Sequence, residues 1–156
     1  MLQNDPWKLI RSLQTVIISS VTDHHAPHSS YAPFIEKEQV FYISLSMMST
    51  HTRNLLEHPQ VSLLFIEDES KSSNIFARRR VTFDASVTPV ERNSIEFNGA
   101  MTLFTDKFGE MAAIYQTMSD FQLFALTPIR GRAVFGFGQA YTYADGKFGS
   151  MPVGKR

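Results

Sequence analysis

Three consecutive arginines, Arg78, Arg79 and Arg80, directly precede an alternating run of apolar and polar residues that predicts a β-strand. A surface strand tolerates one or two solvated arginines, whereas three in a row indicate that an anionic group lies nearby. Because successive side chains of a strand point to opposite faces, Arg78 and Arg80 share one face and Arg79 lies on the other. The run therefore predicts a local anion site to which only some of the three guanidinium groups contribute.

A second candidate anion site is the segment from Ser49 to Arg53, which lies between a predicted strand and a predicted helix. Hydroxyl groups, the free N–H groups of a helix N-terminus and a nearby arginine are groups that bind phosphate. The alternative is an ordinary helix start capped by Ser49, with Arg53 in solvent. No glycine-rich phosphate loop precedes the segment, so neither a P-loop nor a dinucleotide-binding fold is predicted.

A third candidate is the predicted strand at residues 28–36, which contains Ser30, Tyr31 and Ala32 followed by Pro33. The proline removes one backbone donor and leaves neighbouring backbone groups free to bind a ligand. The alternative is an edge strand that the proline protects from aggregation. The pattern alone favours the edge strand.

The other residues that could carry chemistry have little support. His24, His25 and His28 lie in or near one turn, but no pattern such as HExxH accompanies them, so no metal is expected and their role is open. The chain has no cysteine, which excludes thiolate metal sites and a cysteine nucleophile. No GxSxG motif predicts a serine nucleophile. Asp120 is interpreted as a turn carboxylate between a helix and a strand.

Composition restricts the class of protein. The 156 residues include fifteen basic and fifteen acidic side chains, and the lack of a basic excess argues against a nucleic-acid-binding protein. No segment reaches the ~18 apolar residues of a membrane-spanning helix, and the amphipathic N-terminus does not resemble a signal peptide. We therefore expect one cytoplasmic domain, residues 1–156, that binds neither nucleic acid nor membrane.

The elements that would position the candidate residues are mostly strands. The N-terminal segment 1–13 is predicted to form an amphipathic helix that begins at Asp5 and Pro6. Short turns join the first three strands, which predicts an antiparallel meander. Strands are predicted at residues 15–22, 28–36, 40–46, 61–68, 80–91, 121–129 and 132–143.

Two further helical regions are predicted. The helix that follows Ser49 is expected to bury Leu55 and Leu56. Residues 93–118 are expected to form two helices that break near Thr105. About seven strands joined mostly by short turns, with a few helices, predict an antiparallel barrel with helical additions.

The Gly-rich segment at residues 144–156 is predicted to be a loose C-terminal tail.

Five segments occur along the chain in the order SYAPF, ISLS, HTRNLLEHPQVSLLFIEDES, FARRRVTFDA and GFGQAY. Their joint pattern, from about Gln14 to Tyr141, resembles the haem-utilisation branch of the pyridoxamine 5′-phosphate oxidase-like proteins. The resemblance implies the FMN-binding split β-barrel: a mainly β (α+β), antiparallel fold with a few flanking helices. It also implies a homodimer that holds its cofactor in a groove between the subunits.

The resemblance implies an FMN site made of two strands beside the flavin ring, a phosphate-binding turn, and arginines near the pyrimidine edge. Since alternation admits only one of the two arginines, we assign the flavin edge to Arg80 and a salt bridge or phosphate contact to Arg79. Arg78 is then expected in solvent. The implied cofactor-binding residues are Ser30, Tyr31, Ala32, Ser44, Leu45, Ser46, Ser49, Thr50, His51, Arg53, Arg79 and Arg80.

Two departures from the family pattern affect the expected function. The oxidase proper has a lysine in place of His51 and an arginine in place of Ser30, so weaker phosphate binding and no vitamin B6 oxidation are expected. Haem-degrading members have an iron-ligating histidine in a longer C-terminal segment, whereas this sequence has no histidine after His58. Asp120 matches an aspartate near the haem iron of those members and would be an unusual sole ligand.

Three functions follow from these observations. The favoured one is an FMN-dependent oxidoreductase for an unidentified small-molecule substrate, in which the flavin does the redox chemistry. The first alternative is a haem-binding or haem-degrading protein, and the second is a non-catalytic dimeric binding module. The dimer contact is expected on the strand with Phe83 and on the strand with Phe135 and Phe137.

Overall fold

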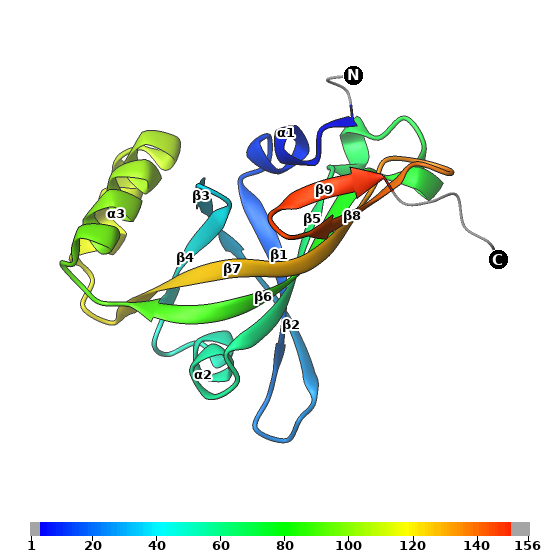
Figure 1. The fold of residues 1–156 in the computed structure, drawn as a ribbon. Helices are drawn as coiled ribbons and strands as arrows, with labels where there is room; N and C mark the ends of the chain where they lie inside the picture. The colour runs from blue at the N-terminus through cyan, green and yellow to red at the C-terminus, as the bar shows by residue number, and fades with distance from the viewer. Residues whose placement is uncertain (1–3, 151–156) are drawn as a thin grey trace.

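An antiparallel sheet curls into a half-open barrel that carries helices at its ends and along one side (Figure 1). The coordinates are a computed structural model, which describes residues 4–150 apart from the side chains of residues 115–117 and 150. The strands are β1 (Thr15–Val21), β2 (Pro27–Pro33), β3 (Ile35–Lys37), β4 (Val40–Ser46), β5 (Gln60–Ile66), β6 (Arg80–Val90), β7 (Phe121–Val134), β8 (Ala140–Ala144) and β9 (Lys147–Ser150). The helices are α1 (Pro6–Arg11), α2 (Thr50–Glu57), α3 (Ile95–Phe108) and α4 (Glu110–Thr117), and 3₁₀ turns lie at Glu69–Lys71 and Ile75–Ala77.

The strand order within the described residues is β2-β1-β5-β6-β7-β4-β3, with β8 paired to β7 and β9 paired to β8. All of these pairs are antiparallel. The predicted mainly β, antiparallel barrel with a few helices is therefore confirmed.

The predicted meander of the first three strands is confirmed in its two antiparallel pairings, β1 with β2 and β3 with β4, but its middle strand is not continuous. The segment expected as one strand at residues 28–36 forms β2 and β3, which lie at opposite edges of the sheet. Pro33 ends β2 because it lacks the N–H group that would continue the ladder. Phe34 follows it and is buried in the barrel core. The crossing at Pro33 and Phe34 thus joins the two edges of the barrel.

Aromatic side chains fill the barrel interior. Strand β6 alternates buried and partly exposed residues over its first half, as its sequence predicts. Trp7 of α1 closes one end, with its ring centroid 6.0 Å from that of Phe41 and 5.8 Å from that of Phe83. Phe83 is fully buried and Phe135 is 8% exposed, so these two side chains belong to the core of the single chain, whereas Phe137 is 80% exposed. The expected dimer contact on the strand with Phe83 and on the strand with Phe135 and Phe137 stays a prediction.

The C-terminal segment is more ordered than expected. Residues 147–150 form β9, whose Phe148 packs edge-on against Trp7 and Tyr143. The predicted loose tail is therefore wrong up to residue 150, and residues 151–156 lie outside the described part. The strands expected at 121–129 and 132–143 are also redistributed, because β7 runs without interruption to Val134.

Helices α3 and α4 pack on the outer face of the sheet and enclose a second apolar core with β4 and β7. They are separated at Gly109, whose φ of 75° favours glycine. The predicted break at Thr105 is wrong, because its hydroxyl donates to the Met101 carbonyl within the helix at 3.1 Å. In α2, Leu55 is buried as predicted, but Leu56 is 44% exposed. No helix in the described range is long and apolar enough to cross a membrane.

Candidate functional site

A cavity of about 560 Å³ opens between the α3–α4 pair, the end of β4 and the edge strand β2. It combines an apolar wall with a smaller polar rim. Its lining residues are Tyr31, Pro33, Ser44, Leu45, Ser46, Ser49, His51, Met101, Phe104, Phe108, Met111, Ala112 and Phe121.

The helices supply most of the apolar wall. Met101, Phe104 and Phe108 lie at helical spacing on one side of α3, and Met111 continues the wall from α4 after the chain turns at Gly109. These residues were absent from the predicted site. Their apolar spacing of three and four residues was visible in the sequence, but it identifies a buried helix face and does not tell a ligand cavity from a core.

The end of β4 supplies part of the polar rim. Ser44, Leu45 and Ser46, which were predicted beside the cofactor, all line the cavity. They pair with the first residues of β7, where Ser46 lies opposite Phe121. The two strands therefore hold these side chains on a rigid part of the sheet.

Strand β2 contributes through alternate residues. Tyr31 is 66% exposed and lines the cavity, whereas Ala32 is 2% exposed and belongs to the barrel core. Ser30 lies on the same face as Ala32 and contacts His51. Of the three residues predicted on this strand, only Tyr31 reaches the cavity directly.

The start of α2 brings two more predicted residues to the cavity. Ser49 and His51 line it, while Thr50 and Arg53 are exposed and do not. Ser49 occupies the N-cap position, but its side chain makes no capping hydrogen bond. The turn is closed by Thr52, which is buried and donates to the Ser46 carbonyl at 2.5 Å. The Ser49 hydroxyl is thus left to face the cavity.

Within the described residues, the His51 ring makes one side-chain hydrogen bond. Its Nδ1 lies 2.9 Å from the Ser30 Oγ, in a hydrogen bond whose direction depends on the imidazole tautomer. Burial lowers the pKa of His51, and the nearby His28 lowers it further when charged. The imidazole is therefore neutral at neutral pH, and a neutral imidazole can donate through one nitrogen and accept a proton or a metal through the other.

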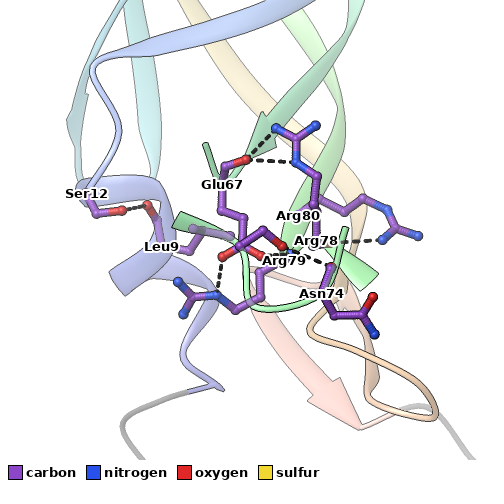
Figure 2. Close-up of polar contacts among 8 residues, drawn as sticks. Leu9, Ser12, Glu67, Asn74, Arg78, Arg79 and Arg80 are labelled. Atoms are coloured by element: carbon purple, nitrogen blue, oxygen red, sulfur yellow. Dashed lines mark hydrogen bonds and ion pairs between the residues drawn. The ribbon is translucent and has the colours of Figure 1, made fainter. Parts of the chain in front are cut away.

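The arginine run contacts an anion that belongs to the chain itself (Figure 2). The Glu67 carboxylate, 8% exposed, accepts hydrogen bonds from the backbone N and the Nε of Arg79, each at 2.8 Å. Burial alone would raise the pKa of Glu67, but the hydrogen bonds and charge of Arg79 outweigh burial and lower it. Arg79 thus forms the predicted salt bridge.

The environment of Arg78 differs from the predicted one, while the assignment of Arg80 to the flavin edge stays a prediction. The Arg78 guanidinium donates to the Glu67 carbonyl through Nε at 3.1 Å and through a terminal nitrogen at 2.5 Å. Its side chain is only 22% exposed, so the expectation of a solvated residue is wrong. Arg80 donates to the Arg78 carbonyl at 3.1 Å. None of the three arginine side chains of this run lines the cavity described above.

The remaining candidate residues, Asp120 and the histidines near the first turn, do not line the cavity. Asp120 is exposed, and its carbonyl accepts a hydrogen bond from the Met47 N–H at 2.7 Å, one residue before Phe121. The His25 ring lies 5.5 Å from the His58 ring. Within the described residues, no group of three or more His, Cys, Asp or Glu side chains could hold a metal ion.

The half-open barrel with a cavity beside its edge strand is the architecture of a known protein class. The chain belongs to the pyridoxamine 5′-phosphate oxidase family, whose model matches residues 8–135. It is 39% identical over 128 residues to a protein named heme oxygenase HutZ from Vibrio cholerae serotype O1 (strain ATCC 39315 / El Tor Inaba N16961), and the match covers 82% of this chain and 73% of HutZ.

Two solved structures show the same fold. A crystal structure of Vibrio cholerae HutZ, described as a heme storage protein, has a TM-score of 0.75 and 34% identity, over 78% of this chain and 86% of the other. The crystal structure of Campylobacter jejuni ChuZ has a TM-score of 0.89 and 28% identity. That match covers 97% of this chain but 63% of ChuZ, so this chain spans less than two thirds of that protein.

These similarities confirm the predicted family and change the expected function. The expectation of an FMN-dependent oxidoreductase is wrong, because HutZ, to which this chain is 39% identical, is named a heme oxygenase and described as a heme storage protein. The haem alternative is the one that the relatives favour.

Proposed function

We propose that this protein binds haem in the cavity between the α3–α4 pair, β4 and β2. Haem binding is the property that both descriptions of HutZ share. The observation that carries the proposal is the cavity itself, with an apolar wall that meets a hydroxyl-lined rim. Its volume of about 560 Å³ lies within the range of small-molecule sites.

The two surfaces of the cavity fit the two parts of haem. The wall of Phe and Met side chains suits the flat apolar macrocycle, because aromatic rings and thioethers pack closely against such surfaces. The carboxylates of haem need hydrogen-bond donors, which Ser46 and Ser49 supply beside the N-terminus of α2. Arg53 lies in the first turn of α2 and adds positive charge at that end of the helix, although its side chain does not line the cavity. When bound, haem supplies an iron whose free positions can take a further ligand.

A homodimer would complete this site. Two apolar side chains that line the cavity are exposed, Tyr31 at 66% and Met111 at 66%, and Met48, which precedes the lining residue Ser49 in the chain, is 88% exposed. Contiguous exposed apolar residues commonly mark an interface. Arg80, which lines no part of the cavity within one chain, is the predicted site residue that a second subunit would bring to this groove. Light scattering at micromolar concentration tests this proposal, and a monomeric mass would contradict it.

A matched pair of variants tests the haem site. Met111 and Ile95 are both exposed apolar helix residues, at 66% and 93%, but only Met111 lines the cavity. Met111→Glu places a carboxylate against the macrocycle and is expected to weaken haem binding at least about tenfold, which is about 1.4 kcal/mol. Ile95→Glu is expected to bind as the unchanged protein does.

The measurement is a haem titration followed by the Soret band. A saturable change for the unchanged protein, weakened only by Met111→Glu, supports the site. No saturable binding contradicts the proposed function, and equal loss in both variants contradicts the proposed location.

A further inference from the structure

The contact between His51 and Ser30 leaves one imidazole nitrogen for a ligand. The Nδ1 of His51 is 2.9 Å from the Ser30 Oγ, and no hydrogen bond or ion pair to the Nε2 occurs among the described residues. His51 also lines the cavity, whereas Ser30 lies beyond it. A histidine with one nitrogen bonded to a neighbour and the other facing a cavity has the arrangement of a metal ligand with its supporting group.

Few side chains of the cavity could serve as an iron ligand. Tyr31, Met101 and Met111 are the alternatives to His51. A tyrosine ligand must lose its phenolic proton, which costs free energy at neutral pH. Thioethers are weak donors, and Met101 is 3% exposed and packed in the second core. His51 has the stronger donor atom and a defined orientation.

We propose that the Nε2 of His51 coordinates the iron of bound haem, and that Ser30 positions the imidazole by accepting the hydrogen bond of Nδ1–H. This inference rests on the proposed haem function. It assigns the Nδ1–H tautomer to His51 and makes Ser30 a positioning residue that acts through the imidazole. The bond is a donation of the Nε2 lone pair to iron and requires no oxidant or reductant.

The test uses haem-loaded protein and resonance Raman spectroscopy of its ferrous form. The unchanged protein is expected to show an iron–imidazole stretching band, which His51→Ala loses and added imidazole restores. Ser30→Ala is expected to shift the frequency of that band without removing it. His24→Ala, which removes a histidine from an exposed turn outside the cavity, is expected to leave the band unchanged.

The possible outcomes separate the two proposals. If the unchanged protein binds no haem, the proposed function fails. If haem binds and the band persists in His51→Ala, the function stands and His51 is not the ligand. If Ser30→Ala leaves the frequency unchanged while His51→Ala abolishes the band, the positioning role of Ser30 is overturned and the ligand assignment stands.

Discussion

The guanidinium of Arg79 and the carboxylate of Glu67 form a salt bridge in which Nε lies 2.8 Å from Oε2, while the Arg79 backbone N donates to the other carboxylate oxygen. One acidic side chain thereby joins the end of β5 to the start of β6. The backbone repeats the connection, because the Glu67 N–H donates to the Arg79 carbonyl at 2.9 Å. The loop between these residues is therefore closed by both side-chain and backbone contacts.

Glu67→Gln should lower the free energy of unfolding by about 1–3 kcal/mol at pH 7, because it removes the charge from a buried, hydrogen-bonded pair. Urea titration followed by circular dichroism measures this change. Glu69→Gln is the matched control, since Glu69 is 74% exposed and lies 3.7 Å from Arg78. It should change stability by less than about 0.5 kcal/mol. Equal losses of stability in Glu67→Gln and Glu69→Gln would show that the Glu67–Arg79 pair stabilises the fold no more than the exposed pair of Glu69 and Arg78 does.

The same pair predicts a dependence on pH. The pKa of Glu67 is lower in the folded chain than its ordinary value of 4.5. The unfolded chain therefore takes up this proton at a higher pH than the folded one, and the contribution is present above about pH 4.5 and lost as pH falls through the folded-state pKa. Stability curves between pH 7 and pH 3 should fall less steeply for Glu67→Gln. Parallel curves would contradict this prediction.

Arg78→Gln should be more destabilising than Arg80→Gln. Arg78 makes two hydrogen bonds to the Glu67 carbonyl and is 22% exposed, whereas Arg80 makes one to the Arg78 carbonyl. We expect a loss of about 1–2 kcal/mol for Arg78→Gln and about half of that for Arg80→Gln, by urea unfolding. A larger loss of stability in Arg80→Gln than in Arg78→Gln would contradict this prediction and would show that Arg80 makes the more stabilising contact.

Gly131→Ala should destabilise the sheet by about 1–3 kcal/mol through overpacking. A Cβ at this position would lie 2.5 Å from Cδ1 of the buried Phe83 and 2.6 Å from the Thr82 carbonyl oxygen. Gly149→Ala in β9 is the control, because its Cβ would meet no atom within 4 Å. Thermal unfolding should show a lower midpoint for Gly131→Ala alone, and equal midpoints would mean that Phe83 moves aside without cost.

Tyr42 should ionise later than an ordinary tyrosine. Burial raises its pKa to about 12, and its hydrogen bond to Glu96 at 2.9 Å adds to the effect. Because the pKa is higher in the folded chain, the associated stability is present below about pH 10 and is lost as pH rises toward 12. The ultraviolet titration curve of the unchanged protein minus that of Tyr42→Phe should have its midpoint near pH 12. A midpoint near 10 would contradict it.

The barrel could be predicted because strand β6 and its neighbours show their alternation directly in the sequence. The crossing of the chain at Pro33 could not, because a proline indicates an edge or interruption without saying to which edge the chain continues. The helix break at Gly109 was missed because Thr105 looks like a cap, yet its hydroxyl finds the Met101 carbonyl inside the helix.

The candidate site, like the fold, could be predicted from the sequence only in part. The polar rim from Ser44 to His51 could be identified from residue types, and these residues do meet at one cavity. The anion that the arginines contact was missed, because the register of β5 against β6 is needed to place Glu67 beside Arg79. The irregular turns between these strands hide that register from sequence patterns.

The packing of Trp7 against Phe148 has a consequence for synthesis. One ring comes from the first helix and the other from the last described strand, with centroids 6.0 Å apart. On the ribosome, the indole of Trp7 emerges long before Phe148, so the aromatic packing at this end of the barrel cannot be completed until the chain has been translated through Phe148. Until then one apolar face stays uncovered, and a nascent chain stalled before β9 would be a natural substrate for chaperones that bind exposed aromatic surface.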